Sequence, residues 1–183
     1  EFGFRTSDPI LQRPGAMVKR AMKAGPRRQR GVAQLPIPRH MLAASDVIVK
    51  QSRFLGAGCG LFVAKDVSAG VKLPGPYKGK MLQPDQLSRL RDFSYCVLLP
   101  KSAKAAAIDA KACRRGNLLR YVNGAKTAAQ RRLINVKIVW QRNEIHFVTT
   151  RKVRCGSEFV VDYGADYWKG LAHNHRLDEL QSQ

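Results

Sequence analysis

Arg120-Tyr121-Val122-Asn123 and Glu158-Phe159-Val160-Val161-Asp162-Tyr163-Gly164 are the two short segments that decide the fold. Between them lie two β-like runs, 133–140 and 144–148, and the polar break at 141–143 is short enough for a hairpin. In the second run, apolar residues alternate with Glu144 and His146, which is the period of a strand with one buried face. This pattern predicts that His146 faces solvent.

Two further blocks precede these segments. Gly58-Cys59-Gly60 lies between the strand candidates 47–49 and 61–64. Glycines at such a loop leave room for a ligand to approach the backbone closely. The block Gly75-Pro76-Tyr77-Lys78-Gly79 follows, and then a short helix is predicted over 83–90, entered at Pro84.

In this order the blocks resemble the SET domain, the fold of most protein lysine methyltransferases, over roughly residues 46–168. The resemblance implies a mostly β fold of several small antiparallel sheets with short helices. It also implies a pseudoknot near the C-terminus, in which the Asn123 segment is threaded beneath a loop near Tyr163. The predicted organisation is a basic flexible arm (1–45), a SET domain (46–168) and a C-terminal tail (169–183) that forms a short helix.

The resemblance also implies the site residues. Tyr163 is expected to be catalytic, with its hydroxyl directed at the transferring methyl group. The expected cofactor is S-adenosylmethionine, with S-adenosylhomocysteine as product and no metal. The cofactor-binding residues are expected to be Gly58, Cys59, Gly60, Tyr95, Arg120, Asn123, Gly124 and Trp168. The channel for the substrate lysine is expected to be lined by Tyr77, Tyr95, Val161 and Tyr163.

Such a site must align sulfur, methyl and nitrogen and present the lysine amine unprotonated. A free lysine has a pKa of about 10.4, but an apolar aromatic channel and a neighbouring sulfonium both disfavour its charged form. A general base is therefore not required. Aromatic rings also attract the cationic sulfonium and a methylated ammonium.

Two positions depart from the usual family pattern. The chain has Asn123-Gly124-Ala125 where the family commonly has Asn-His-Ser, so a degenerate module that binds protein or nucleic acid without catalysis stays an alternative. Val161 stands where the family usually has Phe or Tyr, and the smaller side chain predicts di- or trimethylation.

The net charge is +20, from 33 Lys and Arg against 13 Asp and Glu. This excess favours a polyanionic partner, because Lys and Arg release condensed counterions on contact with phosphates, although a merely solvated basic surface is the alternative. Two basic clusters, Lys19-Arg20 and Arg27-Arg28-Gln29-Arg30, have about the spacing of a bipartite nuclear-import signal or are simply part of a basic tail.

A nuclear enzyme acting on a histone, with nucleosomal DNA or RNA contacting the basic surface and the arm, is the favoured interpretation. A cytoplasmic or organellar methyltransferase of another basic protein, such as a ribosomal protein, is the alternative.

Other classes of protein are disfavoured. No stretch approaches the roughly 18 apolar residues of a membrane span, so no membrane partner is expected. Cys59, Cys96, Cys113 and Cys155 lack the spacing of a zinc site, and His173-Asn174-His175 lacks a nearby third ligand. Reduced thiols and an intracellular location are expected.

Overall fold

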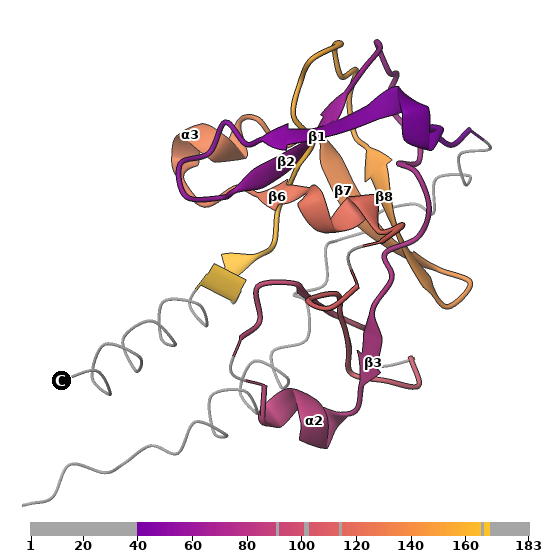
Figure 1. Ribbon diagram of the computed structural model, residues 1–183, viewed down its shortest axis with the longest axis vertical. Helices are drawn as coiled ribbons and strands as arrows, with labels where there is room; N and C mark the ends of the chain where they lie inside the picture. The colour runs from indigo at the N-terminus through magenta and orange to yellow at the C-terminus, as the bar shows by residue number, and fades with distance from the viewer. Residues whose placement is uncertain (1–39, 91, 101–102, 114, 166, 169–183) are drawn as a thin grey trace, which may run out of the picture. The chain divides into compact units, whose positions relative to one another are not determined.

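Short strands dominate the described part of the chain (Figure 1). The computed structural model describes residues 40–90, 92–100, 103–113, 115–165 and 167–168. Most of the predicted basic arm and the whole of the predicted tail with its helix lie outside these residues. Among the described helices, none has the length and apolar character needed to cross a membrane.

The described elements form three antiparallel sheets and one parallel pair. The antiparallel sheets are β1–β2, β3–β5–β4 and β7–β8, and the parallel pair is β6–β9. The prediction of a mostly β fold with small antiparallel sheets and short helices is confirmed, and the pseudoknot stays a prediction. The strands are β1 (Val47–Gln51), β2 (Cys59–Val63), β3 (Lys80–Leu82), β4 (Cys96–Leu98), β5 (Ala107–Asp109), β6 (Asn123–Gly124), β7 (Val136–Gln141), β8 (Glu144–Thr149) and β9 (Val160–Val161). The helical segments are η1 (Ala44–Asp46), α2 (Pro84–Ser88), η2 (Leu118–Tyr121) and α3 (Ala128–Arg131).

The predicted hairpin is confirmed as β7–β8, with Gln141 paired to Glu144 across the turn. Arg142 and Asn143 both have positive φ angles, 50° and 64°, as a two-residue type I′ turn requires. The strand β7 begins later than predicted, because α3 and the turn that follows it occupy the residues before β7.

The prediction that His146 faces solvent is wrong. His146 is only 8% exposed, and its Nε2 lies 3.2 Å from the Glu144 carboxylate. The reason is that the segment 71–77 runs along the second edge of β8, where Leu73 N donates to Phe147 O and Tyr77 N donates to Ile145 O. Residues 145–149 are therefore all buried, and burial lowers the pKa of His146.

The main hydrophobic core joins β2, β8 and η2 through residues such as Leu61, Leu119 and Phe147. A smaller cluster contains Phe54, Ala125 and Val160. β9 contributes to both clusters, since Val161 belongs to the first and Val160 to the second.

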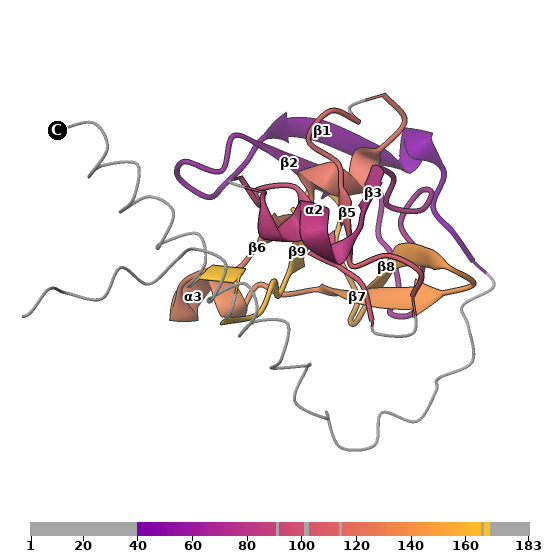
Figure 2. The same cartoon turned by 90° about the horizontal axis from the view of Figure 1, so that it is seen from below.

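Asn135 forms hydrogen bonds with β9 on the side opposite to β6. Its side-chain Nδ2 donates to Glu158 O at 2.8 Å, and its Oδ1 accepts from Val160 N at 2.9 Å. Its backbone N donates to Val160 O at 3.0 Å. Because Asn135 is buried, these bonds satisfy its polar groups and fix β9 beside β6 (Figure 2).

Candidate functional site

Four tyrosines line a small cavity of about 20 Å³, a volume suited to a single water molecule. They are Tyr77, Tyr95, Tyr163 and Tyr167, and the rest of the wall is Ser94, Cys96, Val97, Leu119, Arg120 and Phe147. The Tyr77 ring lies parallel to that of Phe147, and its hydroxyl donates to Tyr95 O at 2.7 Å. Burial raises the pKa of Tyr77, and it raises the pKa of Cys96 to about 12. The wall is therefore aromatic and, at neutral pH, the Tyr77 phenol and the Cys96 thiol are uncharged.

Tyr163 reaches this cavity from the loop after β9. Its hydroxyl donates to Val122 O at 2.6 Å, and burial strongly raises its pKa, so it remains a phenol. Its ring lies directly against the backbone of Gly124, where a Cβ would overlap the ring carbons. Glycine at position 124 is what permits this position of Tyr163.

Tyr167 and Trp168 cover the Tyr163 ring. The ring centroids of Tyr163 lie 4.7 Å from Tyr167 and 5.8 Å from Trp168, and Lys126 Nζ lies 5.9 Å from the Trp168 ring. Trp168, which the resemblance expects to bind the cofactor, therefore lies close to Lys126 and to the Tyr163 ring. Tyr167 was not predicted from the sequence, although an aromatic pair so soon after Gly164 was a usable signal.

The glycine loop is joined to the same segment through Asn123. The Asn123 Nδ2 atom donates to Cys59 O at 3.1 Å and to Glu158 Oε1 at 3.0 Å. The loop that contains Gly58 and Gly60 and the ring of Tyr163 thus both contact the dipeptide Asn123–Gly124. The sequence blocks that the resemblance assigned to one site do come together.

The two loop glycines have different structural roles. Gly58 has a φ of +68°, and a Cβ added there would meet nothing within 4 Å, so its surroundings are open. At Gly60, a Cβ would overlap the Glu158 carboxylate. The space beside Gly60, which the sequence suggested was left for a ligand, is instead filled by Glu158.

Glu158 is the residue of this region that sequence reasoning missed. It is 5% exposed and also accepts hydrogen bonds from Ser52 Oγ at 2.7 Å and Arg53 N at 2.9 Å. A carboxylate directly before the apolar run 159–161, with a polar Asn in the partner block, was the available signal.

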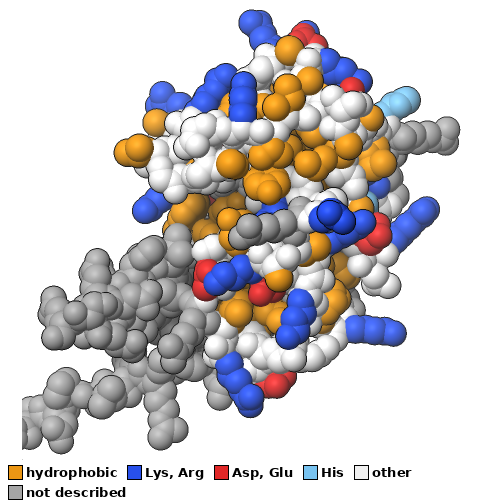
Figure 3. Space-filling model, in the orientation of Figure 1, with side chains coloured by type: hydrophobic (Ala, Val, Ile, Leu, Met, Phe, Trp, Pro, Cys, Tyr) orange, Lys and Arg blue, Asp and Glu red, His pale blue; other side chains and the backbone are white. Residues whose placement is uncertain are grey.

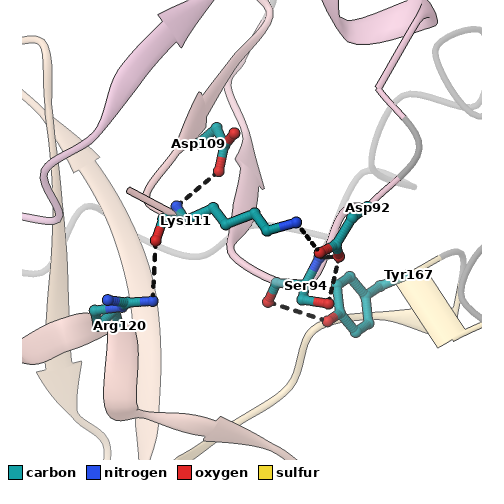
Figure 4. Close-up of polar contacts among 6 residues, drawn as sticks. All are labelled: Asp92, Ser94, Asp109, Lys111, Arg120 and Tyr167. Carbon is teal, nitrogen blue, oxygen red and sulfur yellow. Dashed lines mark hydrogen bonds and ion pairs between the residues drawn. The ribbon is translucent and has the colours of Figure 1, made fainter. Parts of the chain in front are cut away.

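Arg120 lies at the tyrosine cavity and not at the glycine loop. It is 8% exposed, and its guanidinium carbon lies 4.2 Å from the centroid of the Tyr95 ring. Its Nη2 donates to Lys111 O at 3.4 Å, whereas its Nε and Nη1 are buried without a hydrogen-bond partner among the described residues (Figure 4). The cavity wall therefore contains a permanent cation.

An ion pair holds the loop that supplies Ser94 and Tyr95 (Figure 4). Lys111 Nζ lies 2.8 Å from the Asp92 carboxylate, which also accepts from Ser94. The hydrogen bond to Lys111 is the largest cause that lowers the pKa of Asp92 to about 2. The Tyr167 hydroxyl donates to Ser94 O at 3.4 Å, which links the aromatic cover to this loop.

Of the four residues predicted for the lysine channel, Tyr77, Tyr95 and Tyr163 line the cavity. Val161 does not, because its side chain is 1% exposed and belongs to the main core. No group of three metal-ligating side chains occurs among the described residues, and all four cysteines are free.

The fold and this arrangement are those of a methyltransferase-like domain of the SET type. Residues 47–174 match the model of the PR domain of PR domain zinc finger protein 2, so the chain belongs to the PR domain family, which is related to the SET domain. The resemblance inferred from the sequence blocks is thereby confirmed. No curated protein matches the chain.

Solved structures agree on the fold. The methyltransferase domain of human PR domain-containing protein 2 is 23% identical with a TM-score of 0.54, over 75% of this chain and 95% of that chain. ATXR5 in complex with a mono-methylated histone is 20% identical with a TM-score of 0.53, over 66% and 57%. The ctPRC2 complex, from Chaetomium thermophilum, bound to S-adenosylmethionine is 27% identical with a TM-score of 0.51, over 73% of this chain but only 17% of that one.

The contact between Gly124 and Tyr163 yields a testable prediction. Gly124→Ala places a methyl group in the space that the Tyr163 ring occupies. Such overpacking lowers the free energy of unfolding by about 1–3 kcal/mol. We expect urea denaturation to show this loss in the wild-type background and a much smaller loss in Tyr163→Leu, where the ring is absent. Gly70→Ala is the control for backbone strain without a clash, since Gly70, unlike Gly124, has a positive φ and no neighbour near its Cβ position, and its cost should be the same with and without the Tyr163 ring. Additive effects of Gly124→Ala and Tyr163→Leu, within about 0.5 kcal/mol, contradict the contact.

Proposed function

We propose that this domain transfers a methyl group from S-adenosylmethionine to a lysine side chain of a protein, with a histone in chromatin as the favoured substrate. The observation that carries the proposal is the convergence on residues 122–124. Tyr163 contacts Val122 and Gly124, while Asn123 binds the glycine loop. A tyrosine-lined cavity and a loop suited to the cofactor are thus joined by one short segment.

Three groups fit the cofactor. Gly58 lies in open surroundings, the Asn123 Oδ1 atom receives no hydrogen bond from a described residue, and Trp168 offers an aromatic face close by. Gly124, which was also predicted to bind the cofactor, is buried beneath the Tyr163 ring. S-adenosylmethionine, when bound, supplies an electrophilic methyl group on a cationic sulfur. The residues of the chain would hold and orient this group without taking part in covalent chemistry.

The cavity suits an uncharged amine. Its wall is largely aromatic, and the buried phenol of Tyr163 stays protonated, so Tyr163 acts by hydrogen bonding and not as a base. The Arg120 guanidinium disfavours a second cation in the same apolar space. Both effects favour the neutral form of a lysine that enters, which is the nucleophilic one.

A second candidate is a module that binds protein or nucleic acid without catalysis. The observation that favours it is that the Tyr163 hydroxyl already bonds to Val122 O, beside a cavity no larger than one water molecule. A methyltransferase of a ribosomal or other non-histone protein, in the cytoplasm or an organelle, is a variant of the first proposal and differs from it only in substrate.

Cysteine labelling tests the position of the cofactor. Cys59 belongs to the glycine loop and is exposed, and Cys155 is also exposed but lies elsewhere in the sequence and outside the proposed site. We expect S-adenosylhomocysteine to slow the reaction of Cys59 with a thiol reagent and to leave the rate at Cys155 unchanged, as measured by peptide mass spectrometry. Equal rates at Cys59 with and without S-adenosylhomocysteine contradict the assigned cofactor loop.

The catalytic role is tested by Tyr163→Phe. The variant keeps the ring on Gly124 but removes the hydroxyl, and loss of one positioned donor lowers turnover by about 100-fold. We expect this decrease in radiolabelled methyl transfer to nucleosomes, free histones or total lysate, with unchanged binding of S-adenosylhomocysteine. Tyr121→Phe, at a tyrosine outside the cavity lining, is the matched control. Transfer by Tyr163→Phe at the wild-type rate refutes the role, and no transfer by the wild type to any acceptor favours the non-catalytic module.

The basic surface generates a prediction on salt. Arg151 donates to the carbonyls of Ile134 and Arg132, which places Arg131, Arg132 and Arg151 together at the end of α3. Lys and Arg also predominate over Asp and Glu on the face shown in Figure 3. Nucleosomal DNA is the proposed partner for this surface.

We expect nucleosome binding to weaken steeply between about 50 and 200 mM salt and peptide binding to change little. Replacing Arg131 and Arg132 by alanine should reduce the salt slope by about 2. Lys65→Ala is the control, since its amine lies 2.8 Å from Asp46 and is already paired. A salt slope that the arginine substitutions leave unchanged excludes this surface.

A further inference from the structure

The side-chain amide of Asn123 is held between two acceptors. One is the carbonyl oxygen of Cys59 and the other is a carboxylate oxygen of Glu158, at 3.1 and 3.0 Å. The two ends of a carboxamide are nearly identical in shape but opposite in hydrogen bonding. Because a carbonyl and a carboxylate accept hydrogen bonds, the NH₂ end must face both of them. The Oδ1 end therefore points the other way, and no described residue donates to it.

Glu158 is itself rigidly held. Ser52 Oγ and Arg53 N donate to its carboxylate, and the missing side chain of Gly60 makes room for it. It forms no ion pair with a described Lys or Arg, so neutral donors fix its orientation. With Asn123, three donors converge on one carboxylate that is 5% exposed. The orientation of the Asn123 amide is thus fixed by the Glu158 carboxylate, which is itself held in one orientation.

We propose that Glu158 is a positioning residue that makes Asn123 present an oxygen, and hence a hydrogen-bond acceptor, to the cofactor. The inference rests on the proposed function, in which the Asn123 Oδ1 atom faces the cofactor. Of the charged groups of S-adenosylmethionine, the ammonium of its amino-acid end is a hydrogen-bond donor, whereas the carboxylate is only an acceptor. The oxygen of Asn123, backed by the negative charge of Glu158, selects the ammonium and disfavours a ligand that lacks it.

Replacing Glu158 by Gln tests whether Glu158 orients the Asn123 amide or only stabilises the fold. Gln has the same shape but only one acceptor oxygen. Arg53 N is a backbone donor that cannot reverse, so it retains this oxygen, whereas the Ser52 hydroxyl can turn and accept. The NH₂ group of Gln then faces the NH₂ group of Asn123, while Cys59 O still accepts from Asn123, so neither orientation of the Asn123 amide satisfies both neighbours. The amide is no longer held with its oxygen toward the ligand.

The experiment compares S-adenosylhomocysteine with its desamino analogue, in which hydrogen replaces the amino group, by calorimetry at one pH. We expect the wild type to prefer S-adenosylhomocysteine by about tenfold or more. Glu158→Gln should bind both ligands with affinities within about threefold of each other, and Glu158→Asp, which keeps two acceptor oxygens, should restore part of the preference. A wild-type preference retained in Glu158→Gln overturns the inference, because a purely structural carboxylate would weaken both ligands equally.

Nuclear magnetic resonance of the ligand-free protein gives an independent readout. Both Asn123 side-chain N–H protons should exchange slowly with solvent in the wild type, because both are hydrogen-bonded. This measurement, and the ligand preference of the wild type, hold even if Glu158→Gln fails to fold. Failure of the wild type to bind either ligand counts against the proposed function, whereas equal binding of both ligands by the wild type counts against this inference alone.

Discussion

The two-residue parallel ladder between β6 and β9 is the constraint on which the rest of the site depends. It pairs Asn123 with Val160 and Gly124 with Val161, so the chain that leaves β9 brings Tyr163 onto Gly124. A ladder of this length supplies few hydrogen bonds of its own. Buried polar side chains complete it, with Asn135 bonded to β9 from the other side and Glu158 bonded to Asn123. The geometry of the site is therefore fixed by satisfied polar groups as well as by the apolar core.

Two buried residues of opposite charge precede the strands of this ladder, Arg120 before β6 and Glu158 before β9. Glu158 is bound to the glycine loop, and Arg120 lines the tyrosine cavity. A buried carboxylate favours a cation near it, whereas a buried guanidinium opposes one. This division matches the two components of the proposed reaction, since the cofactor is cationic and the lysine must be neutral. The high net charge of the chain describes its surface and gives no hint of this internal arrangement.

Local sequence patterns correctly predicted the elements whose formation depends on residues close together in the chain. The hairpin followed from a polar break between two apolar runs, and α2 from a proline at its first turn. The prediction for His146 failed because the segment 71–77 packs along β8, a contact between distant residues that alternation along one strand does not reveal. Glu158 was missed for a similar reason, since its donors at Ser52 and Arg53 are remote in sequence. The order of the blocks identified the family, but Val161 shows that a matched position need not line the cavity.

The departure from the family pattern at Gly124 is explained by packing. The Cβ atom of a histidine at this position would overlap the Tyr163 ring. The observed position of the ring therefore requires glycine at position 124. The same close contact works against turnover, because it holds the hydroxyl on Val122 O and leaves a cavity of only about 20 Å³. A lysine side chain can enter only if part of the wall moves. Tyr77 belongs to the main core and Tyr163 packs against it, whereas Tyr167 lies outside that core and contacts Tyr163, Trp168 and Ser94. Of these three rings, Tyr167 is therefore the one that can move without disturbing the main core.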